Sequence, residues 1–366
     1  MKKIERFQRG MGIGGWLTNY KRFNVLPENQ RMDITIGDLE HFASYITEKD
    51  IAYIASLGLD HIRLGFDQIV IEETPYKYRA STVKNLHDFV DWCEKYGLRP
   101  ILNMHKAIGN YCDIPSKIGL MDDPELCDRF TALWTMLENE FASDNEVMFE
   151  LLNEVVEDDS IKWNGLAKAT IDAIRETNKE RYIIVGCGRW GTPPGLDTLE
   201  TYDDDHIIYT FHTYSPFEFT HQRGVLQART LYYNRELSWP CDDIERYRGF
   251  YAAHGSASDF DRWYPGVTRM DINVLRGEFK HVSDFIARNP DKILWCGEFG
   301  TIRHAKMEWR ENWMRDIITL LKENDMPYCV WNYLSTPNDG NRFSLVDDDT
   351  REILSERMHQ IILGNV

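Results

Sequence analysis

The sequence predicts an α/β protein folded as a (β/α)8 TIM barrel, and three observations support this prediction. Short apolar runs recur eight times along the chain. Stretches with helical periodicity lie between these runs. The chain has 366 residues, which is long for an average domain but normal for one barrel with insertions. We therefore expect residues 1–366 to form a single domain with a closed parallel sheet.

The eight apolar runs are the expected strands. In Val147-Met148-Phe149, three apolar residues in succession indicate a strand that is covered on both faces, as in a parallel sheet. The other runs have a similar composition and also lead into polar residues. The eight expected strands are 11–16, 61–66, 100–105, 147–154, 182–186, 207–214, 293–298 and 328–333.

Helical patterns separate several of these strands. Apolar residues spaced by three and four predict helices near 83–93, 126–141 and 309–320. Gly97 ends the first pattern, and Pro124 precedes the second in a position that suits the first turn of a helix. An open doubly wound sheet is the alternative fold. It would need a GxGxxG turn after the first strand, and Gly12-Ile13-Gly14-Gly15 matches that motif only loosely.

Residues 215–289 are too many for a simple connection from strand 6 to its helix. We interpret them as an aromatic-rich insertion on the face that carries the functional site, followed by a helix from about Asp271. Most of its aromatic residues are expected to form a small core of their own, and the remainder to offer stacking surfaces for a ligand. Trp239 and Trp263 are the candidates for such a surface.

Composition limits the possible partners. The formal charge is −17, from 42 Lys and Arg against 59 Asp and Glu. Such a chain is a poor partner for nucleic acid or an anionic membrane surface, and no run approaches the ~18 apolar residues of a membrane span. Aromatic residues make up 13% of the chain, which with the acidity favours a neutral polar ligand. The oligomeric state remains open.

The cysteines and the N-terminal residues predict a cytoplasmic location. Seven cysteines are scattered without CxxC spacing, and Cys93, Cys187, Cys296 and Cys329 lie in apolar runs. We expect buried free thiols in a reducing compartment. The segment MKKIERFQRG has a basic start but no apolar stretch of a signal peptide. A signal removed from the chain would make the protein secreted instead.

Polar residues gather where the expected strands end. The carboxyl ends of all strands of a parallel barrel lie on one face, around one pocket. The pair Glu154 and Glu298 at this face suits glycoside hydrolysis, in which one carboxyl protonates the leaving oxygen and the other attacks the anomeric carbon or activates water. The remaining polar strand-end residues are Arg63, Asn103, His105, Asn153, His212, Tyr214, Trp331 and Asn332.

The set resembles glycoside hydrolase family 5, a cellulase-like family of retaining (β/α)8 glycosidases. Six motifs occur in family order through nearly the whole chain: HIRL at 61–64, LNMH at 102–105, LNE at 152–154, FHTY at 211–214, GEFG at 297–300 and VWN at 330–332. The segment Ser215-Pro216-Phe217-Glu218-Phe219-Thr220-His221-Gln222 also resembles one found after strand 6 in bacterial members. Many members carry a second His after the strand-3 His, where this chain has Lys106.

The resemblance implies a role for each residue. Glu154 would be the acid/base and Glu298 the nucleophile, and Arg63 and Tyr214 would keep Glu298 ionised. The other implied substrate contacts are Asn153 at the sugar 2-hydroxyl, His105 in the pocket, His212 near the acid/base and Trp331 under the cleaved sugar. These roles suit the chemistry, because an attacking carboxylate needs a neighbouring cation and hydrogen-bond donors, whereas a proton donor needs the reverse.

The expected activity is retaining hydrolysis of β-1,4-glucans or their oligosaccharides, as in an endoglucanase or cellulase. Within this class the alternatives are β-mannosides, cleaved by a mannosidase or mannanase, and β-1,3-glucans. A non-catalytic carbohydrate-binding barrel would have no use for two apposed acids. A metal-dependent hydrolase would use His105, His212 and Glu298, but the sequence lacks HxH or HExxH spacing. We therefore expect no metal and no cofactor.

Overall fold

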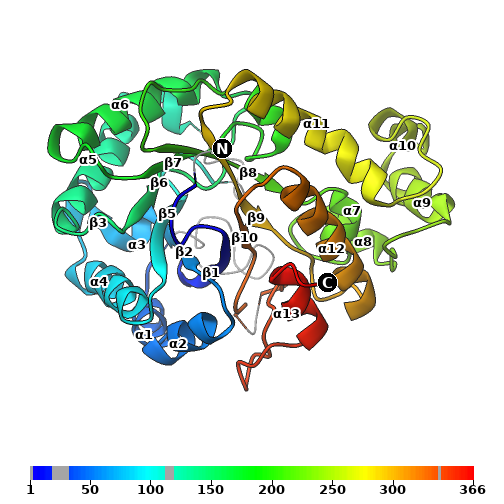
Figure 1. Ribbon diagram of the computed structural model, residues 1–366, viewed down its shortest axis with the longest axis horizontal. Coiled ribbons are helices and arrows are strands. Elements are labelled where there is room, and N and C mark those ends of the chain that lie inside the picture. Colours follow the sequence, from blue (N-terminus) through cyan, green and yellow to red (C-terminus); the bar gives the residue numbers. More distant parts are fainter. Residues whose placement is uncertain (1–2, 19–32, 112–118, 337–338) are drawn as a thin grey trace.

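The computed structural model describes residues 3–18, 33–111, 119–336 and 339–366. Eight parallel strands close into a barrel in which strands that follow one another in the chain are neighbours, and the first strand pairs with the last (Figure 1). Each strand coincides with one of the eight predicted runs, so the (β/α)8 prediction is confirmed. The strands are β1 Arg9–Leu17, β2 His61–Asp67, β5 Arg99–Lys106, β6 Met148–Glu150, β7 Ile183–Val185, β8 Ile207–Thr213, β9 Ile293–Phe299 and β10 Tyr328–Val330.

Helices surround the barrel and bear out the predicted helical patterns. Asp123 caps α5 through its side chain, and Pro124 is the first helical residue, as expected. Asp271 caps α11 in the same way. The helices that pack around the strands are α1 Ile36–Ser44, α2 Glu48–Ser56, α3 Gln68–Ile71, α4 Ala80–Lys95, α5 Pro124–Glu140, α6 Ile161–Thr177, α11 Ile272–Arg288, α12 Met307–Glu323 and α13 Glu356–Ile362. The sequence did not predict the antiparallel hairpin of β3 Glu72–Thr74 and β4 Lys77–Tyr78, or the short 3-10 helices η3 Leu120–Asp122 and η4 Pro193–Asp197.

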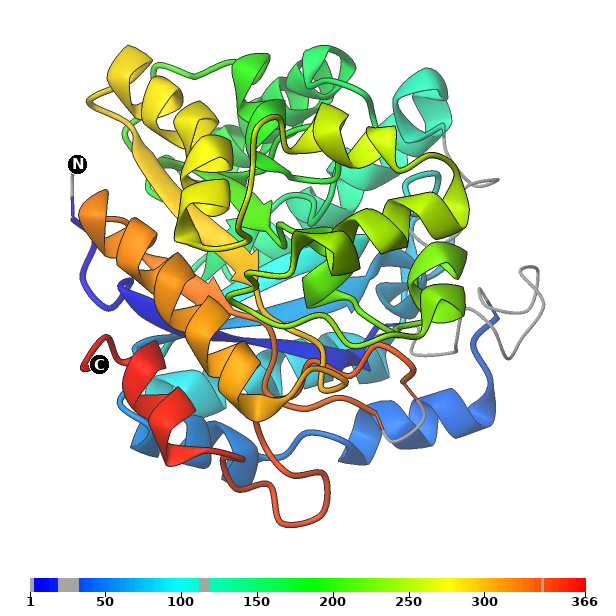
Figure 2. The ribbon, with the colours of Figure 1, turned by 90° about the vertical axis from the view of Figure 1, so that its right-hand side faces the viewer.

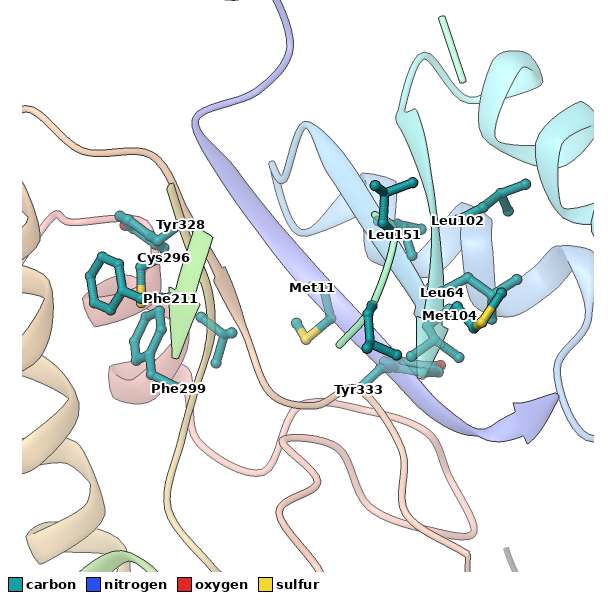
Figure 3. Packing of buried hydrophobic residues seen from close by; sticks show 14 of the residues in the cluster. Met11, Leu64, Leu102, Met104, Leu151, Phe211, Cys296, Phe299, Tyr328 and Tyr333 are labelled. Carbon is teal, nitrogen blue, oxygen red and sulfur yellow. The ribbon is translucent and has the colours of Figure 1, made fainter. Parts of the chain in front are cut away.

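Two apolar clusters fill the fold. The larger one lies between the strands and the helices, and Figure 3 shows part of it, including Leu64, Leu102 and Phe211. The smaller one contains residues from six barrel strands together with Ile4 and Phe7, which precede β1. Its strand residues are Ile101, Met148, Ile184, Ile208, Ile293, Trp295 and Cys329. Since side chains alternate between the two faces of a strand, most of these residues belong to the inner face and plug the barrel.

The same alternation leads from this plug to the polar residues of the site. Two residues beyond Met148 lies Glu150, and four beyond Ile208 lies His212, on the same faces of their strands. On β9, Trp295 and Glu298 are three residues apart, so strict alternation would place them on opposite faces of the strand. An irregularity in the β8–β9 pairing shifts the register by one residue: Phe211 pairs with Cys296, but His212 pairs with Glu298. Gly297 is passed over there, and a Cβ on it would lie 2.5 Å from Oγ1 of Thr210.

The insertion lies between β8 and α11, as predicted. It contains α7 Phe217–Thr220, α8 Ala228–Tyr233, α9 Ile244–His254 and α10 Ser258–Trp263. Figures 1 and 2 both show α8 to α10 grouped beside α11. The expected aromatic core is present, with buried Phe219, Trp239, Tyr247, Phe250 and Phe260.

Trp239 is therefore a core residue, and its prediction as a stacking surface is wrong. Its indole is fully buried, packs 5.8 Å from the ring of Phe219 and donates a hydrogen bond to Asp316 over 2.9 Å. Trp263, the other candidate, is 68% exposed and lines the cleft described below. The four cysteines predicted to be buried thiols are buried and free. Among the described helices, none has both the length and the apolar character needed to span a bilayer.

Candidate active site

A cleft of about 1360 Å³ opens at the carboxyl ends of the strands. Strand ends, the loops that follow them, the insertion and α11 all contribute residues to its lining. Seven of the eight predicted site residues line it, namely His105, Asn153, Glu154, His212, Tyr214, Glu298 and Trp331. Arg63 is fully buried on β2 and hydrogen-bonds two of these residues, Asn153 and Glu298. The structure therefore brings together residues from β2, β5, β8 and β9 and from the segments after β6, β8 and β10.

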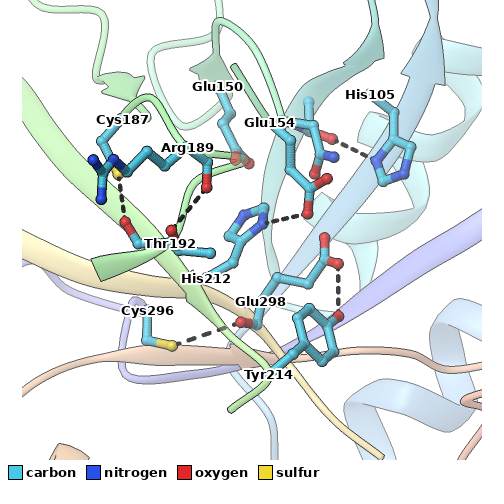
Figure 4. Close-up of polar contacts among 12 residues, drawn as sticks. His105, Glu150, Glu154, Cys187, Arg189, Thr192, His212, Tyr214, Cys296 and Glu298 are labelled. Carbon is cyan, nitrogen blue, oxygen red and sulfur yellow. Dashed lines mark hydrogen bonds and ion pairs between the residues drawn. The ribbon is translucent and has the colours of Figure 1, made fainter. Parts of the chain in front are cut away.

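Glu154 and Glu298 face each other across the cleft (Figure 4). A carboxylate oxygen of each lies within 4.8 Å of the other and of a ring nitrogen of His212. Glu154 follows β6, where the backbone remains tied to the sheet by hydrogen bonds from Leu151 N to Ile184 O and from Asn153 N to Met104 O. Retaining glycosidases separate their carboxyls by about 5–5.5 Å and inverting ones by about 6.5–9.5 Å. An approach of two oxygens to within 4.8 Å is closer than the inverting range and favours the retaining class.

Two donors hold the Glu298 carboxylate. The hydroxyl of Tyr214 donates to Oε1 over 2.6 Å, and Nη1 of Arg63 donates to Oε2 over 2.8 Å. Burial raises the pKa of Tyr214, and the charge of Glu298 raises it further, so the phenol keeps its proton and remains a donor. Both oxygens of Glu298 are thereby oriented before any sugar binds.

Arg63 has a second carboxylate partner that the sequence analysis left without a role. Glu150, fully buried at the end of β6, accepts hydrogen bonds from Nε and Nη2 of Arg63 over 2.6 and 2.9 Å. Nη2 also donates to Oδ1 of Asn153 over 2.5 Å. Burial by itself lowers the pKa of Arg63, but the charges of Glu150 and Glu298 outweigh it and raise that pKa. The Glu-x-x-Asn spacing after an apolar run was the signal that could have identified Glu150.

Glu154 has a different environment. Its Oε1 lies 3.3 Å from Nδ1 of His212, which is almost fully buried on β8. Burial lowers the pKa of His212, and the nearby guanidinium of Arg63 lowers it further, against the opposing charge of Glu298. The imidazole is therefore neutral at neutral pH. The imidazole beside Glu154 is neutral, whereas the guanidinium beside Glu298 is a cation; the first setting suits a proton donor and the second a nucleophile.

Trp331, directly after β10, lies in the cleft with His105 beside it. The two rings are stacked, with centroids 5.3 Å apart and planes inclined by 9°. A Cβ on Gly12 or Gly14 of β1 would come within 2.7 or 2.4 Å of the Trp331 indole. The glycines that loosely resembled a nucleotide-binding turn therefore make room for this ring. Lys106, at the end of β5, also lines the cleft.

Trp190 is a cleft residue that the sequence analysis missed. It is 43% exposed and belongs to a turn after β7 in which Arg189, Trp190 and Gly191 all have positive φ, from 55° to 71°. The backbone of this turn is hydrogen-bonded both to the segment that follows Glu154 and to β8. Trp190 N donates to the carbonyl of Val155, and His212 N donates to the carbonyl of Gly191. Trp190 thus lines the cleft from the turn after β7. The flanking glycines at 188 and 191 were the available signal.

Glu154, His212 and Glu298 are also close enough for a metal ion. The hydrogen bonds of Glu298 argue against this use, since one of its oxygens is held by a guanidinium whose positive charge would repel a cation. His105, the third ligand of the alternative considered above, is not in this group of three. The donor set thus fits acid–base and nucleophilic chemistry better than metal binding.

Comparison with known proteins agrees with this geometry. The model of the cellulase family, glycosyl hydrolase family 5, matches residues 27–336. The chain belongs to this family and is a glycosidase.

Individual relatives cover nearly the whole chain. Endoglucanase C of Acetivibrio thermocellus is 33% identical over 355 residues, which is 96% of either chain. Cellodextrinase A of Ruminococcus flavefaciens is 30% identical over 325 residues, 87% of this chain and 82% of the relative. Among solved structures, endoglucanase Cel5A of Thermotoga maritima superposes with a TM-score of 0.72 at 21% identity, covering 98% of this chain and 97% of the other. At that identity the structural likeness speaks for the fold alone.

Proposed function

We propose that this protein hydrolyses β-1,4-glucan chains or their oligosaccharides with retention of anomeric configuration. The observation that carries the proposal is the pair Glu154 and Glu298, with carboxylate oxygens within 4.8 Å of each other and with unlike neighbours. Glu298, between Arg63 and Tyr214, is the nucleophile. Glu154, beside a neutral imidazole, is the acid/base.

The reaction takes two steps. In the first, the Glu298 carboxylate attacks the anomeric carbon, the bond to the glycosidic oxygen breaks, and Glu154 gives its proton to that oxygen. A covalent ester between the sugar and Glu298 remains. In the second, the Glu154 carboxylate takes a proton from water as the water oxygen attacks the anomeric carbon, and the bond to Glu298 breaks. Both groups then have their starting protonation states.

The neighbouring side chains hold the sugar. Trp331, whose indole is stacked against His105, offers an aromatic surface on which a pyranose ring can lie. Asn153 uses its carbonyl oxygen on Arg63, so its NH₂ group is directed to other partners, and we assign it to the sugar 2-hydroxyl. Such a contact strengthens as positive charge develops on the ring in the transition state.

The relatives support a glucan substrate. Of those described above, one is named an endoglucanase and the other a cellodextrinase. The Thermotoga maritima Cel5A structures include complexes with cellobiose and with mannotriose, so a manno-configured substrate is the alternative that a test must include. The partner of this cleft is accordingly an oligosaccharide or polysaccharide.

We also propose that short chains are preferred and that the enzyme acts in the cytoplasm. The insertion and α11 contribute Tyr251, Trp263, Tyr264 and Glu278 to the cleft wall. A wall on that side narrows an open groove and favours oligosaccharides over polymer. Polymeric cellulose does not enter a cell, whereas short oligosaccharides do.

Covalent trapping tests the assignment. An activated 2-deoxy-2-fluoro-β-cellobioside should add one glycosyl unit to the enzyme, and peptide mass spectrometry should locate it on Glu298. Glu298→Gln should not be labelled and should lose turnover while its melting temperature stays close to that of the wild type. Hydrolysis of gluco- and manno-oligosaccharides of equal length, followed by NMR of the first product anomer, tests substrate and stereochemistry. Labelling of another residue, or an inverted product, would overturn the mechanism.

A further inference from the structure

The segment after β8 that resembles other bacterial members includes a histidine that the proposed mechanism does not use. His221 follows α7, lines the cleft and is only 6% exposed. It lies against Tyr214, the donor to Glu298, with ring centroids 5.1 Å apart. It is therefore one side chain away from the nucleophile.

Three aromatic rings fix the orientation of this imidazole. It stacks on Phe217 at 4.1 Å and 13°, meets Tyr214 edge-on and packs at 5.0 Å from Phe343. The backbone is also fixed, because the N–H of His221 donates to the carbonyl of Phe217. The ring has little freedom to turn, so each of its nitrogens has a set direction.

A short hydrogen-bond chain decides which nitrogen carries the proton. The hydroxyl of Thr220 lies 2.6 Å from the carbonyl oxygen of Tyr214 and 3.0 Å from Nδ1 of His221. A carbonyl has no proton to give, so the single hydroxyl hydrogen belongs to the shorter contact. Nδ1 must then be the donor to Oγ1 of Thr220. In a neutral ring this leaves Nε2 with a lone pair and no hydrogen.

The imidazole of His221 is neutral at neutral pH. Burial lowers the pKa of His221 to about 3. Among the described residues Nε2 has no hydrogen-bond partner, and His221 lines the cleft. It is thus a hydrogen-bond acceptor of fixed direction on the wall of a site whose ligand is rich in hydroxyl groups.

We propose that His221 is a substrate-binding residue whose Nε2 accepts a hydrogen bond from one hydroxyl of the glucan chain bound beside Tyr214. The proposal rests on the proposed function, since it takes a β-1,4-glucan as the ligand. A neutral acceptor of this kind selects for a hydroxyl donor at one ring position. It gives no advantage to a sugar that lacks the hydroxyl or carries an ether there, because neither can donate to it.

Deoxygenated substrates test the inference on the native enzyme. A set of cellotriosides, each lacking one hydroxyl, is compared by kcat/KM with the parent trisaccharide. Removal of one particular hydroxyl should lower kcat/KM about three- to ten-fold, because it eliminates the neutral hydrogen bond to His221. His221→Phe keeps an aromatic ring against Phe217 but has no acceptor. With this variant, kcat/KM for the parent trisaccharide should fall by the same factor relative to the wild type. Removal of the matching hydroxyl from the substrate should then cause no further fall.

Two variants of Thr220 sharpen the test. Thr220→Ser keeps the hydroxyl and both of its hydrogen bonds, so it should behave as the wild type. Thr220→Val removes the hydroxyl that fixes the tautomer of His221. It should reduce the loss of kcat/KM caused by removing that one substrate hydroxyl and leave the effect of removing the others unchanged. His221→Leu also removes the acceptor, and it repeats the comparison if the phenyl ring of His221→Phe disturbs folding. Melting temperatures are measured for all variants.

The outcomes separate the two proposals. Absence of cellotrioside hydrolysis by the wild type would contradict the proposed function. Hydrolysis with equal losses for every deoxy substrate in wild type and His221→Phe would contradict the role of His221 alone. A uniform fall in kcat with unchanged deoxy selectivity would likewise overturn it and leave His221 as a packing residue for Tyr214.

Discussion

At the scale of single residues, the charge of Arg63 is shared between Glu150 and Glu298. In Glu150→Gln the guanidinium keeps its charge but faces only one carboxylate. The guanidinium then interacts more strongly with the Glu298 carboxylate, which makes this carboxylate a weaker nucleophile. We expect the acid limb of the kcat/KM profile to move to lower pH and the plateau to fall at least several-fold, as measured by initial rates from pH 4 to 9.

A matched control is available elsewhere in the barrel. Glu138 and Arg181 form another fully buried pair, joined through Nε over 2.7 Å and Nη2 over 3.2 Å. Glu138→Gln should lower the melting temperature to a similar extent without moving the acid limb. If the two variants have the same pH profile, Glu150 serves only the stability of the fold.

Single residues were predictable where chemistry alone selects them. Glu154, Glu298, Arg63 and Tyr214 have polar side chains that a buried strand end would not otherwise contain, and the structure brings them together. Glu150 lies among apolar neighbours on the same strand, and sequence does not say that a buried acid pairs with an arginine 87 positions away. Trp239 and Trp263 both lie in the aromatic-rich insertion, and the sequence around them does not reveal which one is buried. Only the packing of the folded chain distinguishes them.

At the scale of elements, the insertion contains one buried tryptophan, Trp239, and one exposed tryptophan, Trp263. Trp263→Ala removes an exposed indole at the cleft wall, and we expect KM for cellopentaose to rise several-fold with little change in kcat or melting temperature. Trp239→Ala empties a fully buried site and should cost about 3–5 kcal/mol in the free energy of unfolding. Kinetics on cellotriose and cellopentaose, with thermal melts, distinguish the two. An unchanged KM in Trp263→Ala for both lengths would remove this residue from the binding surface.

Helix α11 places Glu278 at the cleft wall, where its carboxyl accepts a hydrogen bond from Thr213. Burial raises its pKa to about 7, although hydrogen bonds from Ser215 and Thr213 act against this. A carboxyl whose pKa is raised by folding favours the folded state below its unfolded pKa near 4.5, and this contribution is lost as pH rises through 7.

Glu278→Gln cannot ionise and should therefore gain stability relative to the wild type as pH increases. We expect the difference in melting temperature, variant minus wild type, to become more positive by about 2 °C or more between pH 5 and pH 8. Calorimetry at both pH values measures it, with exposed Glu94→Gln as the control. A difference that is independent of pH would mean that Glu278 is ionised at both.

The elements themselves were largely predictable, because period and caps are local properties. The run 147–154 was expected to be one strand, yet β6 ends at Glu150 and the chain then turns into the cleft with only isolated hydrogen bonds to its neighbours. The irregularity that brings Glu298 inward depends on pairing between β8 and β9, which no single segment encodes. Boundaries of this kind arise from contacts between strands that are distant in sequence.

At the scale of the whole molecule, the barrel and the insertion together shape one cleft. If the insertion closes one side, the enzyme should cut oligosaccharides of three to six units faster than internal bonds of soluble carboxymethyl cellulose. Reducing-end assays on both substrates at equal bond concentration, with viscometry of the polymer, compare the rates. Faster cleavage of polymer would contradict both the closed wall and the proposed cytoplasmic location.

The buried charges under the cleft also bear on which sugars the enzyme can tolerate. Arg63 provides one positive charge against two negative ones from Glu150 and Glu298, so this part of the site is anionic. It stabilises a sugar ring that becomes positively charged and repels one that carries a carboxylate. A glucuronosyl unit should therefore be excluded from the cleavage position, whereas a protonated piperidine shaped like glucose should inhibit strongly. Inhibition constants of this amine and of its neutral lactam would measure the enzyme's selectivity for charge.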